Sequence, residues 1–325
     1  MRNHERNSRD HYTEITEQII AALEAGTPPW RQPWDNAKAG GPCMPQNAAT
    51  GARYRGINVL TLGMSPLAFM TGDPRWATYK QAQEHGWQVQ KGSHGVTGFF
   101  YKRIEVDRDE GGTDEGREGG KWFPLLRSFT LFHANQIDGI PSYIPPTIAE
   151  APWRAPESAE TILRNSRAKV RIGGERAFYS PTTDHIQMPP QCAFRSAAAW
   201  ASVQLHELAH WSGNGTRLNR DLSGSFSSAD YSREELRAEI AQVMICAELN
   251  IADCDFTNGT AYVAHWVSKL LGDKKEIFRA AADAQRIADF LLAFHPDFAA
   301  HSAQRDAQPP EVASRDERNQ MKAAA

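Results

Sequence analysis

The feature that most constrains this 325-residue chain is the stretch Val203–Leu218, VQLHELAHWSGNGTRL, which contains His206-Glu207-Leu208-Ala209-His210. Residues four apart share one face of an α-helix, so the imidazoles of this H-E-x-x-H pattern can reach one tetrahedral metal ion. Glu207 would lie beside that ion and can act as a general base toward water. Apolar residues predict a helix over Phe194–Trp211, which Ser212-Gly213-Asn214-Gly215 ends. The pattern predicts a metallopeptidase-type zinc site with His206 and His210 as ligands and Glu207 as the catalytic residue.

A zinc site of this kind needs a third protein ligand, and the best candidates lie in Tyr231–Leu249. Ser232 followed by Glu235 is a capping-box pattern, so we expect a helix that begins at Ser232. Glu235 and Glu239 share a face of that helix, and one can bind the ion while the other accepts the N–H of a ligating histidine. Metallopeptidases with an E-x-x-x-D arrangement use the first acid as the metal ligand, and Glu235-x-x-x-Glu239 resembles that arrangement. We therefore favour Glu235 as the ligand, but the reverse assignment stays open. Zinc is the expected ion, and another divalent transition metal would also fit these donors.

Composition limits the class of protein. The net charge of −3 and the pI near 6.4 do not indicate a nucleic-acid binder, although a local basic patch is averaged away in such values. The four cysteines are scattered without a C-x-x-C pair, which fits a reducing cytoplasm and indicates neither a zinc finger nor a disulfide framework. The N-terminus is polar and no run of 18 apolar residues occurs, so we expect a soluble cytoplasmic protein without a membrane partner.

The chain before the metal motif predicts an α+β region. Thr97–Val106 and Trp122–Phe132 are rich in aromatic and β-branched residues, and they predict a long antiparallel hairpin. The segment between them, Asp107–Lys121, is acidic and glycine-rich, so we interpret it as a disordered hairpin loop. Trp76 begins a predicted short helix. The proline-rich segment 142–156 predicts a linker between two domains.

The second half predicts a small antiparallel sheet followed by helices. Lys169–Ile172 is a short strand, and Ala177–Pro181 with Asp184–Met188 forms a hairpin ahead of the metal helix, as in zincin-type domains. The overall prediction is an α+β fold with two domains. We place their boundaries at 1–141 and 157–298, with the linker at 142–156 and a disordered tail at 299–325.

Cations and aromatic residues interleave in the first domain, as in proteins that hold single strands by phosphate contacts and base stacking. The proline-rich stretch Thr27–Trp34 contributes two tryptophans and an arginine, although either tryptophan alone can instead close over the preceding helix as core. Arg53-Tyr54-Arg55 is the strongest candidate, because two cations flank one ring. The candidate DNA-binding residues are Trp30, Arg31, Trp34, Arg53, Tyr54, Arg55, Lys80, Lys91, His94 and Lys102.

Several stretches together resemble the ArdC-type antirestriction proteins of conjugative plasmids and other mobile elements. They are Thr27–Trp34, Arg53–Asn58, Trp76–Tyr79, Lys91–Gly95, Phe132–Pro141, Tyr179–Pro189, His206–Leu218 and Glu234–Leu249. The N-terminal region of that family also occurs on plasmid primases of the TraC type. The resemblance implies a domain that binds single-stranded DNA, a zincin-like metallopeptidase domain, and protection of incoming unmodified DNA from restriction endonucleases. The acidic insertion at 107–121 is longer than the hairpin of the family.

Two other functions fit the same residues. The protein can coat entering single-stranded DNA without catalysis, with a structural or vestigial metal site. It can also be a peptidase that cleaves a repressor or another host protein, with DNA as the cue.

Overall fold

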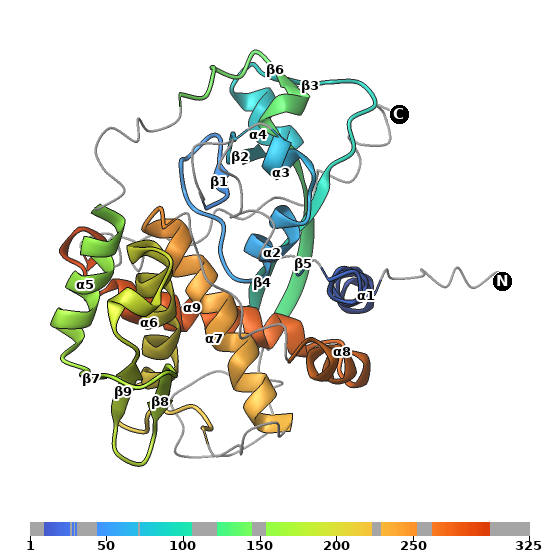
Figure 1. Ribbon diagram of the computed structural model, residues 1–325. Helices are drawn as coiled ribbons and strands as arrows, with labels where there is room; N and C mark the ends of the chain where they lie inside the picture. Colours follow the sequence, from blue (N-terminus) through green and yellow to red (C-terminus); the bar gives the residue numbers. More distant parts are fainter. Residues whose placement is uncertain are drawn as a thin grey trace, which may run out of the picture.

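The computed structural model describes residues 10–26, 28, 30, 44–70, 72–105, 122–144, 154–222, 229–251 and 262–299. The first half of the chain combines short helices with a curved sheet, and the second half is mainly helical with one small sheet (Figure 1). The predicted α+β class is therefore confirmed. Within the described ranges, no helix is long and apolar enough to cross a membrane.

The long hairpin of the first half forms as predicted. Strands β4 (Val96–Glu105) and β5 (Trp122–His133) pair antiparallel over ten residues each, from Val96 with Leu131 to Glu105 with Trp122. The loop predicted at 107–121 lies outside the described residues. Strand β2 adds antiparallel to β5 and β1 adds parallel to β2, which gives the order β1-β2-β5-β4, while β3 and β6 form a separate antiparallel pair. The short elements of this half are β1 (Gln46–Asn47), α2 (Ile57–Gly63), α3 (Leu67–Met70), β2 (Arg75–Ala77), α4 (Tyr79–Glu84), β3 (Gln88–Val89) and β6 (Ile137–Asp138).

The prediction that a short helix begins at Trp76 was wrong about its first residue. Trp76 lies in β2, fully buried, with its ring 4.8 Å from that of His133. The helix begins at Tyr79, because the Thr78 hydroxyl accepts the N–H of Gln81 and caps it.

The second half places its small sheet ahead of the helices, as predicted, but the sheet is mixed. Strands β8 (Phe178–Ser180) and β9 (His185–Met188) form the expected hairpin, whereas β7 (Lys169–Ile172) runs parallel to β9. The order is β7-β9-β8, so the hairpin returns the chain in the direction of β7. The helices are α5 (Arg154–Ser166), α6 (Ala197–Trp211), α7 (Ala229–Glu248), α8 (Val263–Gly272) and α9 (Glu276–Leu292).

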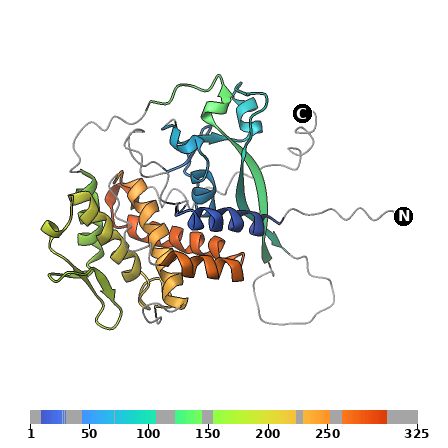
Figure 2. The same cartoon turned by 45° about the vertical axis from the view of Figure 1, so that its right-hand side comes forward.

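The first helix packs against the second half of the chain. Helix α1 (His11–Glu24) begins at Asp10, whose side chain accepts the N–H groups of Tyr12 and Thr13. It lies beside α8 (Figure 2), and its buried residues belong to one hydrophobic core that also contains residues of α2, β4, α7 and α9. This core crosses the predicted linker, so the two predicted domains share buried surface. Their boundaries stay a prediction, and residues 145–153 lie outside the described ranges.

Trp30 is a buried contact between the halves. Its side chain is 1% exposed, and its indole N–H donates to the Glu239 carboxylate of α7 at 2.8 Å. Its ring meets that of Trp266 edge-on, with centroids 5.8 Å apart. The Trp266 indole N–H in turn donates to the carbonyl oxygen of Ser232 at 2.9 Å. Two tryptophans from distant segments therefore contact α7, one near its start at Ser232 and one in its middle at Glu239.

We expect Trp30→Phe to lower the free energy of unfolding by about 1–3 kcal/mol, because the buried Glu239 carboxylate loses a hydrogen-bond donor. Trp87→Phe is the matched control: Trp87 is only half-buried, and we expect a change within about 0.5 kcal/mol. Urea denaturation of both variants measures the difference. Equal effects would mean that the Trp30 hydrogen bond contributes nothing specific.

Candidate metal centre

Helix α6 presents the H-E-x-x-H sequence from a buried position. The Ser196 hydroxyl caps the start of α6 by accepting the N–H of Ala199. The helix therefore begins at Ala197, three residues after the predicted start at Phe194. Leu205, Leu208 and Ala209 are fully buried, while the His206 and His210 side chains keep 12% and 11% of their surface exposed. The helix is therefore fixed by its apolar faces, and the two imidazoles reach the edge of the core.

The imidazoles of His206 and His210 on α6 converge with the carboxylate of Glu235 on α7. The Nε2 atoms of His206 and His210 lie 3.1 Å apart, with the rings nearly perpendicular. The Glu235 carboxylate lies 3.6 Å from His206 Nε2 through one oxygen and 3.4 Å from His210 Nε2 through the other. Ligands about 2.1 Å from a tetrahedral ion are separated by about 3.4 Å, so these donors have the spacing of a metal site. Among the described residues, His206, His210 and Glu235 are the group whose ligand atoms fit together in this way.

The outer nitrogen of His206 is held by Gln242. Its Nδ1 lies 3.2 Å from Gln242 Oε1. The Gln242 amide nitrogen donates to the carbonyl and hydroxyl oxygens of Ser202, at 3.0 and 2.7 Å. These bonds fix the amide so that its oxygen faces the imidazole, and Nδ1 must therefore carry the proton. The Nε2 lone pair of His206 then points toward the site.

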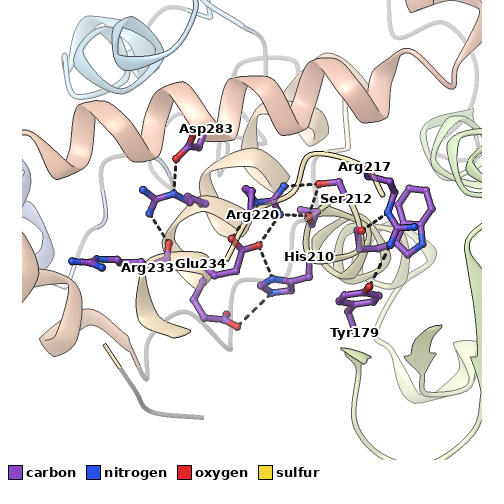
Figure 3. Close-up of polar contacts among 12 residues, drawn as sticks. Tyr179, His210, Ser212, Arg217, Arg220, Arg233, Glu234 and Asp283 are labelled. Atoms are coloured by element: carbon purple, nitrogen blue, oxygen red, sulfur yellow. Dashed lines mark hydrogen bonds and ion pairs between the residues drawn. The ribbon is translucent and has the colours of Figure 1, made fainter. Parts of the chain in front are cut away.

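The outer nitrogen of His210 is held by an acid. Its Nδ1 lies 3.3 Å from Glu234 Oε1, and Arg220 donates to both oxygens of Glu234 at 3.1 and 2.6 Å (Figure 3). Arg220 also donates to the Ser212 hydroxyl and the Ala209 carbonyl oxygen at the end of α6. A Cβ at Gly213 would lie 2.9 Å from the Arg220 guanidinium, so glycine leaves room for this arginine. Two imidazole lone pairs thus face each other at 3.1 Å, an arrangement that a cation between them satisfies.

Two of the sequence predictions about α7 need correction. The helix begins at Ala229, and Ser232 is fully buried inside it, so Ser232 and Glu235 do not form a capping box. Glu239 accepts the Trp30 N–H, and the contacts to the outer histidine nitrogens come from Glu234 and Gln242. Neither Glu234 nor Gln242 was predicted from the sequence to contact the histidines, although Gln242 is two helical turns from Glu235 and therefore on the same face.

Charges around the site shift its titrating groups. Burial lowers the pKa of His210, but Glu235 and Glu234 offset this effect and leave the pKa well above its ordinary value. Burial likewise opposes protonation of His206, and Glu235 leaves its pKa raised. Burial raises the pKa of Glu235, but both imidazoles together bring it far below its ordinary value. Glu235 therefore favours positive charge at the two Nε2 atoms, whether a proton or a metal ion supplies it.

Glu207 differs from these three residues. It is 3% exposed, and burial with the nearby Glu235 carboxylate leaves its pKa raised, although the two imidazoles act in the opposite direction. The backbone N–H of Tyr179 in β8 donates to its carboxylate. A carboxylate with a raised pKa beside the converging ligands is suited to take up a proton.

A second network joins β8 to the end of α6. The Tyr179 hydroxyl donates to Asp184 at 2.8 Å and accepts from Asn214. It also accepts from Arg217 (Figure 3). Arg217 lies over the Trp211 ring, 3.9 Å from its centroid, and donates to the Trp211 carbonyl oxygen. These contacts hold β8 against the end of α6. Strand β8 provides the Tyr179 N–H that contacts Glu207, and α6 carries Glu207.

Tyr231 also contacts the site. It precedes Glu235 by one turn of α7, and its hydroxyl is hydrogen-bonded to the Glu235 carboxylate. Burial and Glu235 raise the pKa of Tyr231, and the Tyr262 ring lies 5.7 Å away. Neither tyrosine was predicted from the sequence to belong to the site.

The candidate DNA-binding residues are spread over several environments. Trp30 is buried, so its ring cannot stack on a base in this conformation. The Tyr54 hydroxyl accepts from Asn47 at 3.2 Å, and burial raises its pKa. Arg53 and Arg55 are ion-paired with Glu248 and Asp289 of the second half.

The remaining candidates lie closer to solvent. Lys80 is half-exposed and 3.7 Å from Glu84, whereas Lys91 and His94 are exposed on the turn between β3 and β4. Arg31, Trp34 and the side chain of Lys102 lie outside the described residues. Residues 44–105 and 122–144 contain eight Lys or Arg and four Asp or Glu, so the described sheet region is basic although the chain is acidic.

Comparison with known proteins agrees with this architecture. Residues 157–283 match a family of zincin-like metallopeptidase domains, which contains α6 and α7. Residues 9–132 match the N-terminal domain of the anti-restriction factor ArdC. The chain belongs to the ArdC family of antirestriction proteins, as its sequence resemblance indicated.

Individual relatives cover most of the chain. The protein y4eC of Sinorhizobium fredii is 39% identical, over 93% of this chain and 95% of its own length. The DNA primase TraC of Escherichia coli is 42% identical over 87% of this chain. The match covers only 27% of the length of the primase. The crystal structures of the antirestriction protein ArdC from plasmid R388 are similar in the metal-free form, with a TM-score of 0.71, 38% identity, and coverage of 88% of this chain and 97% of that one. The Mn(II)-bound form gives a TM-score of 0.72, 37% identity, and coverage of 89% and 99%.

Proposed function

We propose that this protein is an antirestriction protein of a mobile genetic element that binds single-stranded DNA and hydrolyses a peptide bond at a divalent metal. The observation that carries the peptidase half is the convergence of His206, His210 and Glu235, whose ligand atoms lie within 4.8 Å of one another. Two imidazoles and one carboxylate are a zinc donor set that leaves one position open. The ArdC protein of R388 has been crystallised with Mn(II), which supports a divalent ion here and leaves zinc as our proposal.

The residues around the ligands suit hydrolysis. A divalent ion at this position would polarise a peptide carbonyl and make water more acidic. Glu207 is the group that takes a proton from water and returns it to the leaving amine, since its carboxylate is buried with a raised pKa. The Tyr179 N–H orients that carboxylate, and Glu234 and Gln242 hold the imidazoles in one tautomer. The peptide substrate would be a host or element protein.

Single-stranded DNA is the proposed second ligand. The ArdC-type N-terminal domain and the DNA primase relatives support it, together with the excess of cations in the described sheet region. Lys91 and His94 are the candidates best placed to meet a strand, because they are exposed on one turn. The alternative is a protein that coats the strand without catalysis, and the use of this unit within DNA primases favours it as the second candidate.

The contact between Gln242 and His206 provides a test of the metal site. We expect Gln242→Leu to weaken metal binding about 10–100-fold, because His206 loses the acceptor that fixes its tautomer. Gln204→Leu is the control: Gln204 is a fully buried glutamine of α6 with no hydrogen-bond partner among the described residues, and its replacement should leave metal affinity unchanged. Competition between each variant and a fluorescent chelator for Mn(II) or Zn(II) gives the affinities. Equal affinity for both variants would contradict the ligand assignment.

Glu207→Gln separates the two candidate functions. Removal of a general base reduces hydrolysis about 10²–10⁴-fold, so we expect protection of unmodified DNA during transfer to be lost while affinity for single-stranded DNA is unchanged. Glu175→Gln, an exposed substitution in the turn before β8, should retain both properties. Retained protection with Glu207→Gln would favour the coating function over the peptidase.

The salt dependence of DNA binding tests the role of the exposed turn. Each phosphate neutralised on a single strand contributes a slope of about −0.7 in log K against log salt. We expect Lys91→Gln to make the slope shallower by about 0.7, and Lys169→Gln, an exposed cation of β7, to leave it unchanged. Anisotropy titrations at several salt concentrations measure both slopes. A slope that Lys91→Gln leaves unchanged would exclude Lys91 as a phosphate contact.

A further inference from the structure

The two arginines that flank Tyr54 are both engaged by acids of the second half. Arg53 Nε lies 3.2 Å from a carboxylate oxygen of Glu248 at the end of α7. Arg55 pairs with Asp289 of α9. The arginine side chains remain 39% and 40% exposed, so each guanidinium is paired on one side and open to solvent on the other.

The surrounding contacts fix this segment. The N–H of Gly56 donates to the side-chain oxygen of Gln285 at 3.0 Å, and the Gln285 amide nitrogen lies 3.2 Å from Asp289. The N–H of Tyr54 donates to the Pro45 carbonyl oxygen at 2.8 Å. The arginines therefore stand at fixed positions where the two halves of the chain meet.

A carboxylate on a guanidinium uses the same donors that would hold a phosphate. Both anions accept N–H groups of the planar fork, and arginine prefers such oxygen pairs over other acceptors. A nucleic-acid strand therefore reaches Arg53 and Arg55 only if its phosphates replace carboxylates that are already in place.

We propose that Glu248 and Asp289 are internal competitors of the DNA strand. In the free protein their carboxylates occupy the phosphate positions of Arg53 and Arg55, and a bound strand displaces them. This inference rests on the proposed binding of single-stranded DNA. Because a partly exposed ion pair is weak, phosphates displace it readily, and removal of either acid tightens strand binding about two- to fivefold.

The experiment compares Asp289→Asn and Glu248→Gln with the unaltered protein. The probe is a fluorescent oligothymidylate of about 20 nucleotides, titrated at one fixed salt concentration and followed by anisotropy. Glu160→Gln is the matched control, since it removes the same charge from an exposed position on α5. We expect tighter binding with the first two variants and no change with the control.

A second comparison tests whether the tighter strand binding of Asp289→Asn depends on Arg55. In an Arg55→Gln background Asp289 no longer competes with a phosphate for this arginine, so Asp289→Asn should no longer tighten strand binding. A general effect of charge would persist in that background and would overturn the proposal, as would binding by Asp289→Asn and Glu248→Gln no tighter than by the control.

Failure of the wider DNA-binding proposal looks different. In that case neither the unaltered protein nor any variant binds the oligonucleotide. Binding only after an acid is removed supports the competition in its strongest form. Thermal melting checks that each variant is folded, and Glu248→Gln carries the test alone if Asp289→Asn is unstable.

Discussion

Two imidazole nitrogens held 3.1 Å apart in a nearly buried site impose the strongest constraint on this structure. Their outer nitrogens are already committed, that of His206 to Gln242 and that of His210 to Glu234. Free rotation of either ring would relieve the opposed lone pairs, and these contacts prevent it. The fold therefore maintains an arrangement that is unfavourable without a cation, which is the condition under which a site binds a metal tightly.

Helix α7 connects that centre to the rest of the molecule. One part of its surface supplies Glu234, Glu235 and Gln242 to the imidazoles. Glu239 and Glu248 of the same helix accept contacts from Trp30 and Arg53 in the first half of the chain. Because a packed helix moves as a unit, the position of the proposed ligand Glu235 depends on Trp30 and Arg53, which lie far earlier in the sequence.

The extent to which sequence predicted this site follows from the range of each interaction. The spacing of His206 and His210 is local to one helix, so their shared face followed directly from the pattern. The choice between Glu235 and Glu239 depended on how α7 is rotated against α6, which long-range packing sets. The partners of the imidazoles lie 24 and 36 residues away, and nothing near the motif indicated them. Similarly, the local Arg-Tyr-Arg pattern indicated a nucleic-acid contact but not the acids that pair with it, one of them 234 residues away.

The shared core couples the proposed strand binding thermodynamically to the proposed metal centre. Any ligand that favours separation of Arg53 from Glu248 acts on the same helix that presents Glu235, and linkage makes such an effect reciprocal. The size of the coupling is limited by the free energy of the contacts that change, which for partly exposed ion pairs is about 1 kcal/mol or less each. Displacement of the arginines alone therefore shifts metal affinity only a few-fold. A larger switch requires release of the buried Trp30–Glu239 contact, because the desolvated carboxylate there makes the contact much more costly to break.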